Sequence, residues 1–213
     1  MLIVIVYDIE KNSKRTKISK ILECIEKAKN CNNLDELRGF EGYSSSIYFK
    51  ILKNEFEDWG FFKRVKRPLT DPINTLLSFG YTILYSFISS IITLNNLSPY
   101  IGFFHTFSSG HSALASDIME EFRAMAVDKV VFYAINNNLF SKDDFVIEEE
   151  KACYLSYEAK KKFIELLEEN FDKKYFHNAT GFNVNIKRLI DLQVKQYLKL
   201  LNEENFEYKG MIF

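Results

Sequence analysis

The chain has 213 residues, 47% of them hydrophobic, and a net charge of −1 at pH 7. This length and composition suit one large globular domain with a sizeable core. The balanced charge argues against a surface that binds nucleic acid throughout, because such proteins carry an excess of Lys and Arg. Any contact with nucleic acid must therefore come from local basic clusters.

The chain begins with a short run rich in β-branched side chains, residues 2–7, which predicts one strand. The run lacks a basic start and ends too early for a secretory signal. The three cysteines, Cys24, Cys31 and Cys153, have no metal-ligand spacing, and their odd number suits a reducing compartment. We therefore expect a cytoplasmic protein.

Helices are predicted along most of the remaining chain. Asn33 is a candidate N-cap, with Glu36 at the capping-box position, for a helix that runs to about residue 52. Ser156 and Asn185 are candidate N-caps of two later helices. We expect a mainly α fold, a helical bundle-like domain with a short N-terminal strand. Further helices are predicted over residues 14–30, 72–94 and 113–135.

The predicted helix that follows Asp71 and Pro72 has no charged side chain. Asp71 suits its N-cap and Pro72 its first turn. Residues 73–94 are numerous enough to span a bilayer. Their many hydroxyl side chains, however, lower the hydrophobicity below that of a typical span. We interpret the segment as a buried helix of a soluble domain, and a membrane span is the alternative.

Glu41 lies where a carboxylate is unexpected. On an ideal helical wheel it falls on the apolar stripe of its helix. A carboxylate that faces a core is costly unless it is paired, protonated or bound to a metal. An ion pair, for example with Arg38, and a functional role both remain open. The apolar stripe consists of Leu34, Leu37, Tyr48 and Leu52.

A second acidic cluster comprises Asp117, Glu120 and Glu121, which spacings of three and four place on one side of a predicted helix. A solvated acidic face is the ordinary interpretation. However, the like charges repel, and no basic residue follows any of them at a spacing of four. The cluster also follows a long uncharged stretch. These two features favour a functional site.

His105 stands in a loop just before this acidic helix. A histidine together with two separate sources of carboxylate suits Mg²⁺ or Mn²⁺ better than structural zinc. Such an ion polarises a phosphodiester oxygen and stabilises charge in an in-line displacement. His111 is the second candidate ligand. His177 is remote in sequence, and we interpret it as an ordinary polar residue.

A basic loop precedes the uncharged helix and follows Trp59, Phe61 and Phe62. Basic and aromatic side chains together suit contact with a DNA backbone and its bases. An ordinary solvated loop is the alternative. The basic residues are Lys63, Arg64, Lys66 and Arg67.

Four segments, taken in order, resemble the catalytic half of the CRISPR-associated "Cas one" integrase family. Glu41 lies in the first, His105 in the third and Glu120 in the fourth. The last six residues are also similar to the family's C-termini. The similarity extends from about residue 25 to the end. The four segments are residues 34–42, 66–81, 100–106 and 117–123.

This resemblance implies a helical catalytic domain over residues 31–213. It implies that Glu41, His105 and Glu120 bind Mg²⁺ or Mn²⁺ and that Asp117 supports the site. The implied activity is that of a metal-dependent endonuclease and integrase, which inserts spacer DNA into the CRISPR array by 3′-hydroxyl attack on phosphodiesters. The implied partners are DNA, the "Cas two" protein and further copies of the chain. Among the DNA contacts we also expect Tyr81.

The N-terminal part departs from the family. Members have a β-rich N-terminal domain that forms the homodimer, and we expect residues 1–30 to be a truncated or replaced version of it. Residues 1–8 resemble the first strand of the "Cas two" partner. Ser112 and Ala124 stand where relatives often have proline. The alternative to an active integrase is therefore a catalytically defective DNA- or protein-binding remnant.

Overall fold

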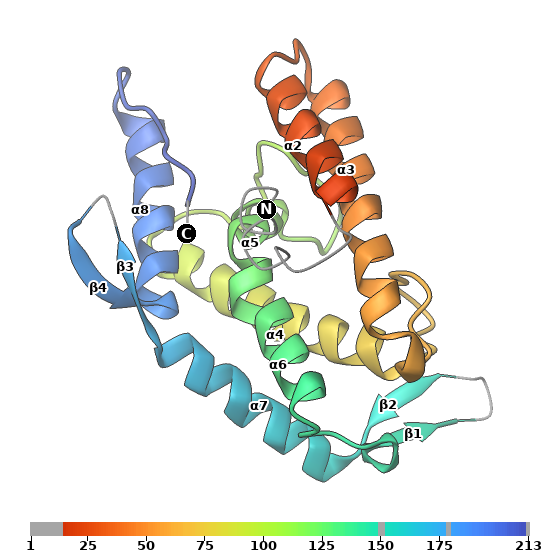
Figure 1. Cartoon of the computed structure of the whole chain (residues 1–213). Helices are drawn as coiled ribbons and strands as arrows, with labels where there is room; N and C mark the ends of the chain where they lie inside the picture. Colours follow the sequence, from red (N-terminus) through yellow and green to blue (C-terminus); the bar gives the residue numbers. More distant parts are fainter. Residues whose placement is uncertain (1–14, 149–151, 178–179, 212–213) are drawn as a thin grey trace. The chain divides into compact units, whose positions relative to one another are not determined.

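The computed structural model describes residues 15–148, 152–177 and 180–211 (Figure 1). Helices make up most of this part of the chain, so the mainly α prediction is confirmed. The strand predicted over residues 2–7 lies outside the described residues.

The chain divides into two compact units. Of the described residues, unit 1 contains those up to Thr75 together with those of Lys142–Leu155, and unit 2 contains those of Leu76–Ser141 and Ser156–Met211. These boundaries differ from the predicted one between residues 30 and 31. The reason is that the first described helix packs against the second, within unit 1.

In unit 1, α2 (Arg15–Lys29) and α3 (Leu34–Glu55) form an antiparallel helical hairpin (Figure 1). Asn33 is the N-cap of α3, as predicted, and its side chain accepts a hydrogen bond from the backbone N–H of Glu36 at 2.9 Å. The predicted apolar stripe is only partly correct, because Leu34 is 47% exposed. The buried residues of α3 are Ser44, Ile47, Tyr48, Ile51 and Leu52.

The second part of unit 1 is a short hairpin that the sequence did not predict. Strands β1 (Phe145–Ile147) and β2 (Cys153–Leu155) pair antiparallel, with Phe145 opposite Leu155. The backbone N–H of Cys153 donates to the carbonyl of Leu69 at 2.7 Å, which fastens the hairpin to the loop before α4. Strands of three residues are too short for a pattern of alternating burial to be recognised. The short helices η1 (Glu57–Trp59) and η3 (Lys142–Asp144) complete the unit.

The uncharged segment forms α4 (Pro72–Leu94), which begins in unit 1 and continues through unit 2. Its length and composition would allow it to cross a membrane, and 44% of its most apolar stretch is buried. Its exposed positions at Thr82, Ser86 and Ser90 form a hydroxyl stripe along one face. The hydroxyls of Thr82 and Ser90 donate to carbonyls one turn earlier. This amphipathic pattern fits a helix that lies on a core.

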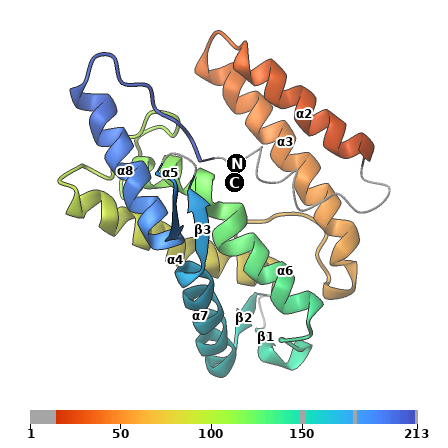
Figure 2. The same cartoon turned by 60° about the vertical axis from the view of Figure 1, so that its left-hand side comes forward.

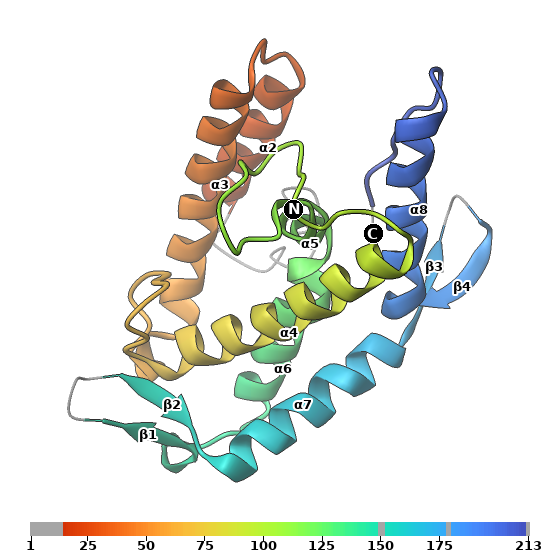
Figure 3. The same cartoon turned by 180° about the vertical axis from the view of Figure 1, so that it is seen from behind.

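The remaining helices of unit 2 pack around α4. Phe79 and Phe87 on α4 contact Phe163 and Phe171 on α7, with ring centroids 6.2 and 6.0 Å apart. The antiparallel pair β3–β4 connects α7 to α8 and packs beside α8 (Figures 2 and 3). The elements of unit 2 are α5 (Ala113–Arg123), η2 (Ala124–Asp128), α6 (Lys129–Asn136), α7 (Tyr157–Asp172), β3 (Lys174–His177), β4 (Phe182–Asn185) and α8 (Ile186–Asn202).

The helix predicted over residues 113–135 contains a π-helical turn, η2, between α5 and α6. Gly80 of α4 lies against this turn, where a Cβ would come within 2.5 Å of Val127 Cγ1. A π turn leaves carbonyls without their regular helical partner. The buried amide of Asn170 on α7 supplies donors, because its Nδ2 bonds to the carbonyls of Met125 and Ala126 at 2.9 and 3.3 Å.

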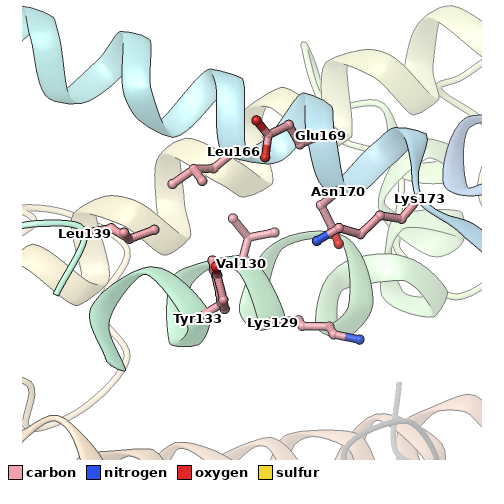
Figure 4. A pocket seen from close by; sticks show the side chains of 8 residues that line it. All are labelled: Lys129, Val130, Tyr133, Leu139, Leu166, Glu169, Asn170 and Lys173. Carbon is pink, nitrogen blue, oxygen red and sulfur yellow. The ribbon is translucent and has the colours of Figure 1, made fainter. Parts of the chain in front are cut away.

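Asn170 also lines a hollow of about 170 Å³ between α6 and α7 (Figure 4). Oppositely charged side chains, Glu169 and Lys173, stand on the α7 side, and Tyr133 stands on the α6 side. None of the predicted site residues lines this hollow.

We predict that Asn170→Ala lowers the free energy of unfolding by about 1–3 kcal/mol, because two buried carbonyls lose a donor. Asn137→Ala is the matched control: its amide makes the same kind of bond, to the carbonyl of Tyr133, at an exposed site. That control should change stability by less than about 0.5 kcal/mol. Urea unfolding followed by circular dichroism measures both, and equal effects would contradict the role assigned to Asn170.

Candidate functional site

The loop that carries His105 is held by the side chain of Asp117 on α5. The backbone N–H groups of Phe103 and Phe104 donate to Asp117 Oδ2 at 2.7 and 3.1 Å, and that of His105 donates to Oδ1 at 2.8 Å. The Asp117 side chain is fully buried. Its carboxylate therefore fixes the loop by accepting from three consecutive residues.

Gly102 permits this close approach of loop and helix. A Cβ at this position would lie 2.6 Å from Asp117 Oδ2 and 2.9 Å from the carbonyl carbon of Ala113. A larger residue would have to displace backbone as well as the carboxylate. The glycine is therefore part of the scaffold that places His105.

The ring of His105 is oriented by the same carboxylate, with Nδ1 2.7 Å from Asp117 Oδ1. Burial raises the pKa of Asp117, but the hydrogen bonds from the His105 ring and from the three backbone N–H groups outweigh burial and leave that pKa below its usual value. Asp117 is thus an acceptor, so Nδ1 carries a proton and Nε2 is the ring nitrogen left for a ligand. Metal-binding histidines have this arrangement, in which the second nitrogen is held by a carboxylate.

The two carboxylate oxygens of Glu120 differ in their surroundings. Oε1 accepts from Arg123 Nη1 at 2.6 Å, and both side chains are less than one-fifth exposed. Oε2 is buried and has no hydrogen-bond partner among the described residues. Buried polar atoms are nearly always satisfied, so this oxygen suits a ligand that the chain itself does not supply.

Arg123 in turn lies on Tyr81, with its guanidinium carbon 4.5 Å from the ring centroid. The Tyr81 hydroxyl donates to Asp128 Oδ1 at 2.5 Å. Burial lowers the pKa of Arg123, but Tyr81, Glu120 and Asp128 raise it well above its usual value, so the side chain stays charged. Tyr81 is only 8% exposed. This burial does not suit the DNA contact predicted for Tyr81, and its place is inside unit 2.

The third acid, Glu121, fastens the C-terminal tail. Its Oε2 accepts from Gln193 Nε2 at 2.8 Å and from the backbone N–H of Met211 at 2.7 Å, and its Oε1 accepts from the Tyr208 hydroxyl. Burial and the neighbouring Glu121 raise the pKa of Tyr208 well above its usual value, so it remains a donor. Glu121 is therefore occupied by structural contacts.

Glu41 is half-buried on α3, one turn before the fully buried Ser44. Arg38, its suggested ion-pair partner, bonds to Asp35 at 2.9 Å. Glu41 belongs to unit 1, whereas His105 and Glu120 belong to unit 2. In the part of the chain that the structure describes, no three His, Cys, Asp or Glu side chains are grouped as a metal site. The convergence of Glu41 with His105 and Glu120 therefore stays a prediction.

The other two histidines have partners of their own. His111 Nε2 lies 3.1 Å from Ser116 Oγ, and its ring stacks on Tyr85 at an interplanar angle of 15°. His177 is buried, and its Nδ1 lies 2.9 Å from Thr180 Oγ1. His105, which is held by Asp117 of α5, remains the better candidate ligand.

The predicted basic loop is shaped by Asn74, a buried residue in the first turn of α4. Its Oδ1 accepts from Arg64 Nη1 at 2.8 Å, and its Nδ2 donates to the carbonyl of Lys63 at 2.9 Å and to Asp71 Oδ2 at 2.7 Å. Burial raises the pKa of Asp71, and the Asn74 bonds and Arg64 oppose that rise. Arg64 thus has an internal role. The side chains of Lys63, Lys66 and Arg67 are exposed.

The partnership of Arg123 with Glu120 was not predicted, because Arg123 does not follow any of the acids at a spacing of four. It follows Glu120 at three residues, a spacing that also brings side chains together on a helix. Asn74 and Gln193 were not expected either. Their importance depends on tertiary contacts that no local pattern reveals.

We predict that Asp117→Asn lowers the free energy of unfolding by about 1.5–3 kcal/mol, since an amide cannot accept from all three backbone N–H groups and the ring. Asp172→Asn, at an exposed ion pair with Lys187, is the control and should cost less than about 1 kcal/mol. Nitrogen NMR of the His105 ring should also show loss of the Nδ1-protonated form. An unchanged tautomer would contradict the orienting role of Asp117.

The sequence is similar to one family model and to several curated proteins. A family model described as CRISPR associated protein Cas1 matches residues 4–169. A CRISPR-associated endonuclease Cas1 of Methanospirillum hungatei is 40% identical over 138 residues, which cover 64% of this chain and 42% of the relative. One from Clostridium perfringens is 34% identical over 187 residues, covering 84% and 56%. The chain spans about half the length of these curated relatives.

Solved structures agree with the sequence relatives. A Cas1 protein from Thermotoga maritima has a TM-score of 0.81 at 26% identity, covering 97% of this chain and 63% of that one. A chain of a Cas6-RT-Cas1–Cas2 complex has a TM-score of 0.85 at 27% identity, covering all of this chain and 24% of that one. A casposase bound to integration product, at 21% identity and a TM-score of 0.81, shares the fold. Since the family model covers most of its length, this chain belongs to the CRISPR-associated Cas1 family.

Proposed function

We propose that this chain is the catalytic part of a divalent-metal-dependent DNA endonuclease and integrase that inserts spacer DNA into a CRISPR array. The proposal is carried by two features of α5: its Asp117 orients the loop residue His105, and its Glu120 has a carboxylate that is incompletely satisfied. Asp117 holds His105 by Nδ1, and Glu120 keeps one buried oxygen without a partner among the described residues. Membership of the Cas1 family supports the same chemistry.

The donor set fits Mg²⁺ or Mn²⁺. Glu120 would bind through Oε2 and His105 through Nε2, and Glu41 of α3 is the proposed third ligand. Oxygen ligands with one imidazole suit these ions, and no thiolate that would favour zinc belongs to the set. When bound, the ion polarises a phosphodiester oxygen and stabilises charge at the attacking and leaving oxygens.

The residues of the chain contribute orientation. Asp117 accepts from His105 Nδ1 and fixes the orientation of the ring, so its other nitrogen, Nε2, is presented at a fixed angle. Gly102 and the three backbone bonds to Asp117 keep the loop in place. A site held this firmly can fix the scissile phosphodiester and the attacking 3′-hydroxyl relative to one another.

The proposed partners are DNA, a Cas2 protein and further copies of the chain, in the cytoplasm. A similar chain occurs in a Cas6-RT-Cas1–Cas2 complex, which supports Cas2 as a partner. The exposed Lys63, Lys66 and Arg67 provide cationic groups for DNA phosphates.

We predict that Glu41→Gln, His105→Ala and Glu120→Gln each lower Mn²⁺-dependent cleavage and strand transfer by at least about 100-fold, because each removes a metal ligand. Glu165→Gln, on the exposed face of α7, is the control. A gel assay on branched and linear DNA measures both activities. Full activity of Glu120→Gln would refute the assignment, and a wild-type chain that binds DNA without cutting it would favour the catalytically defective remnant.

We predict that charge reversal at Lys63, Lys66 and Arg67 weakens DNA binding and flattens its salt dependence. The slope of log K against log salt should fall by about 0.9 for each DNA phosphate that the loop no longer neutralises. Reversal at Lys160 and Lys161, exposed on α7, is the control and should leave the slope unchanged. Fluorescence anisotropy at several salt concentrations measures the slopes. An unchanged slope for the loop variant would make this an ordinary solvated loop.

A further inference from the structure

The two carboxylate oxygens of Glu120 have different surroundings because Arg123 bonds to only one of them. The Arg123 guanidinium occupies Oε1 at 2.6 Å and leaves Oε2 buried and without a partner among the described residues. A carboxylate can bind a metal ion through one oxygen or through both. With Oε1 engaged, Glu120 is prepared to bind through Oε2.

Arg123 is itself held in one orientation. Its guanidinium lies over the face of Tyr81, 4.5 Å from the ring centroid. The Tyr81 hydroxyl donates to Asp128 at 2.5 Å, which fixes the ring. A planar guanidinium on an aromatic face is well ordered, whereas an ammonium group on a flexible stem is not.

The contact between Arg123 and Tyr81 is supported by buried residues of the π turn. Asp128 is the last residue of the π turn η2 and is only 4% exposed. Gly80, beside Tyr81 on α4, lets Val127 of the same turn approach closely. The π turn, Tyr81, Arg123 and Glu120 therefore form one connected series inside unit 2.

We propose that Arg123 is a positioning residue that holds Glu120 by Oε1, so that the carboxylate binds the divalent cation through Oε2 alone. This inference rests on the proposed metal-dependent function. Arg123 acts through Glu120 and has no contact of its own with the cation or the DNA.

Electrostatics and positioning make opposite predictions for the loss of Arg123, which allows a sharp test. Removing a positive charge near a cation site would by itself strengthen cation binding. Removing a residue that orients a metal ligand typically weakens metal affinity by about 10- to 100-fold. The sign of the change in Mn²⁺ affinity therefore distinguishes the two effects.

The experiment measures Mn²⁺ binding to the full purified chain by electron paramagnetic resonance of free Mn²⁺, without DNA. The variants are Arg123→Met, which removes charge and hydrogen bond, and Arg123→Lys, which keeps the charge but loses the planar fork. Arg188→Met is the matched control, since Arg188 also pairs with an acid three residues away, Asp191, but at the surface of α8. Circular dichroism verifies that each variant is folded.

We expect Arg123→Met to weaken Mn²⁺ binding by about 10- to 100-fold, Arg123→Lys to fall between it and the wild type, and Arg188→Met to match the wild type. Equal or tighter binding by Arg123→Met overturns the inference. If Arg123→Met fails to fold, Arg123→Lys decides, and wild-type affinity in that variant overturns the inference.

The same measurements distinguish failure of the role proposed for Arg123 from failure of the proposed metal-dependent function. A wild-type chain that binds no Mn²⁺ overturns both. A wild-type chain that binds Mn²⁺ and loses binding in Glu120→Gln, but not in the Arg123 variants, leaves the proposed function intact and overturns only the role of Arg123.

Discussion

The buried carboxylate of Asp117 is the interaction on which the rest of the site in unit 2 depends. A buried charge is costly unless it is fully satisfied, and here three backbone N–H groups and one imidazole satisfy it. The bonds act in both directions, because they stabilise the charge and also fix the loop. His105 is consequently positioned by helix α5, through Asp117, and its position does not depend on the loop alone.

Three neighbouring acids on one face of α5 are tolerated because each has a different environment. Asp117 is surrounded by the N–H donors of the loop, Glu120 by Arg123, and Glu121 by Gln193 and the C-terminal tail. Repulsion among like charges is thereby relieved within less than two helical turns. The oxygens of Asp117 and Glu121 all accept hydrogen bonds from the protein. Among the described residues, the buried carboxylate oxygen without a partner is Oε2 of Glu120.

The features that were predicted correctly from the sequence are local ones. Asn33, Ser156 and Asn185 each cap the expected helix by accepting from a backbone N–H three residues later, and the apolar periodicity predicted most helix bounds to within a few residues. Strands of three or four residues carry too little pattern to be recognised. The bonds from Asn170 to the π turn span more than 40 residues, so only the folded chain reveals them.

The π turn has a consequence for how this region tolerates changes in length. Because a π turn holds one residue more than an α-helical turn, a single deletion within Ala124–Val127 can be absorbed by a return to regular helix, with the buried faces of α5 and α6 kept in phase. A deletion elsewhere in these helices would instead rotate every later position by about 100°. In the shortened helix the carbonyls of Met125 and Ala126 would have no further need of Asn170. Helix length at this turn is thus linked to Asn170, whose two bonds to these carbonyls matter only while the extra residue is present.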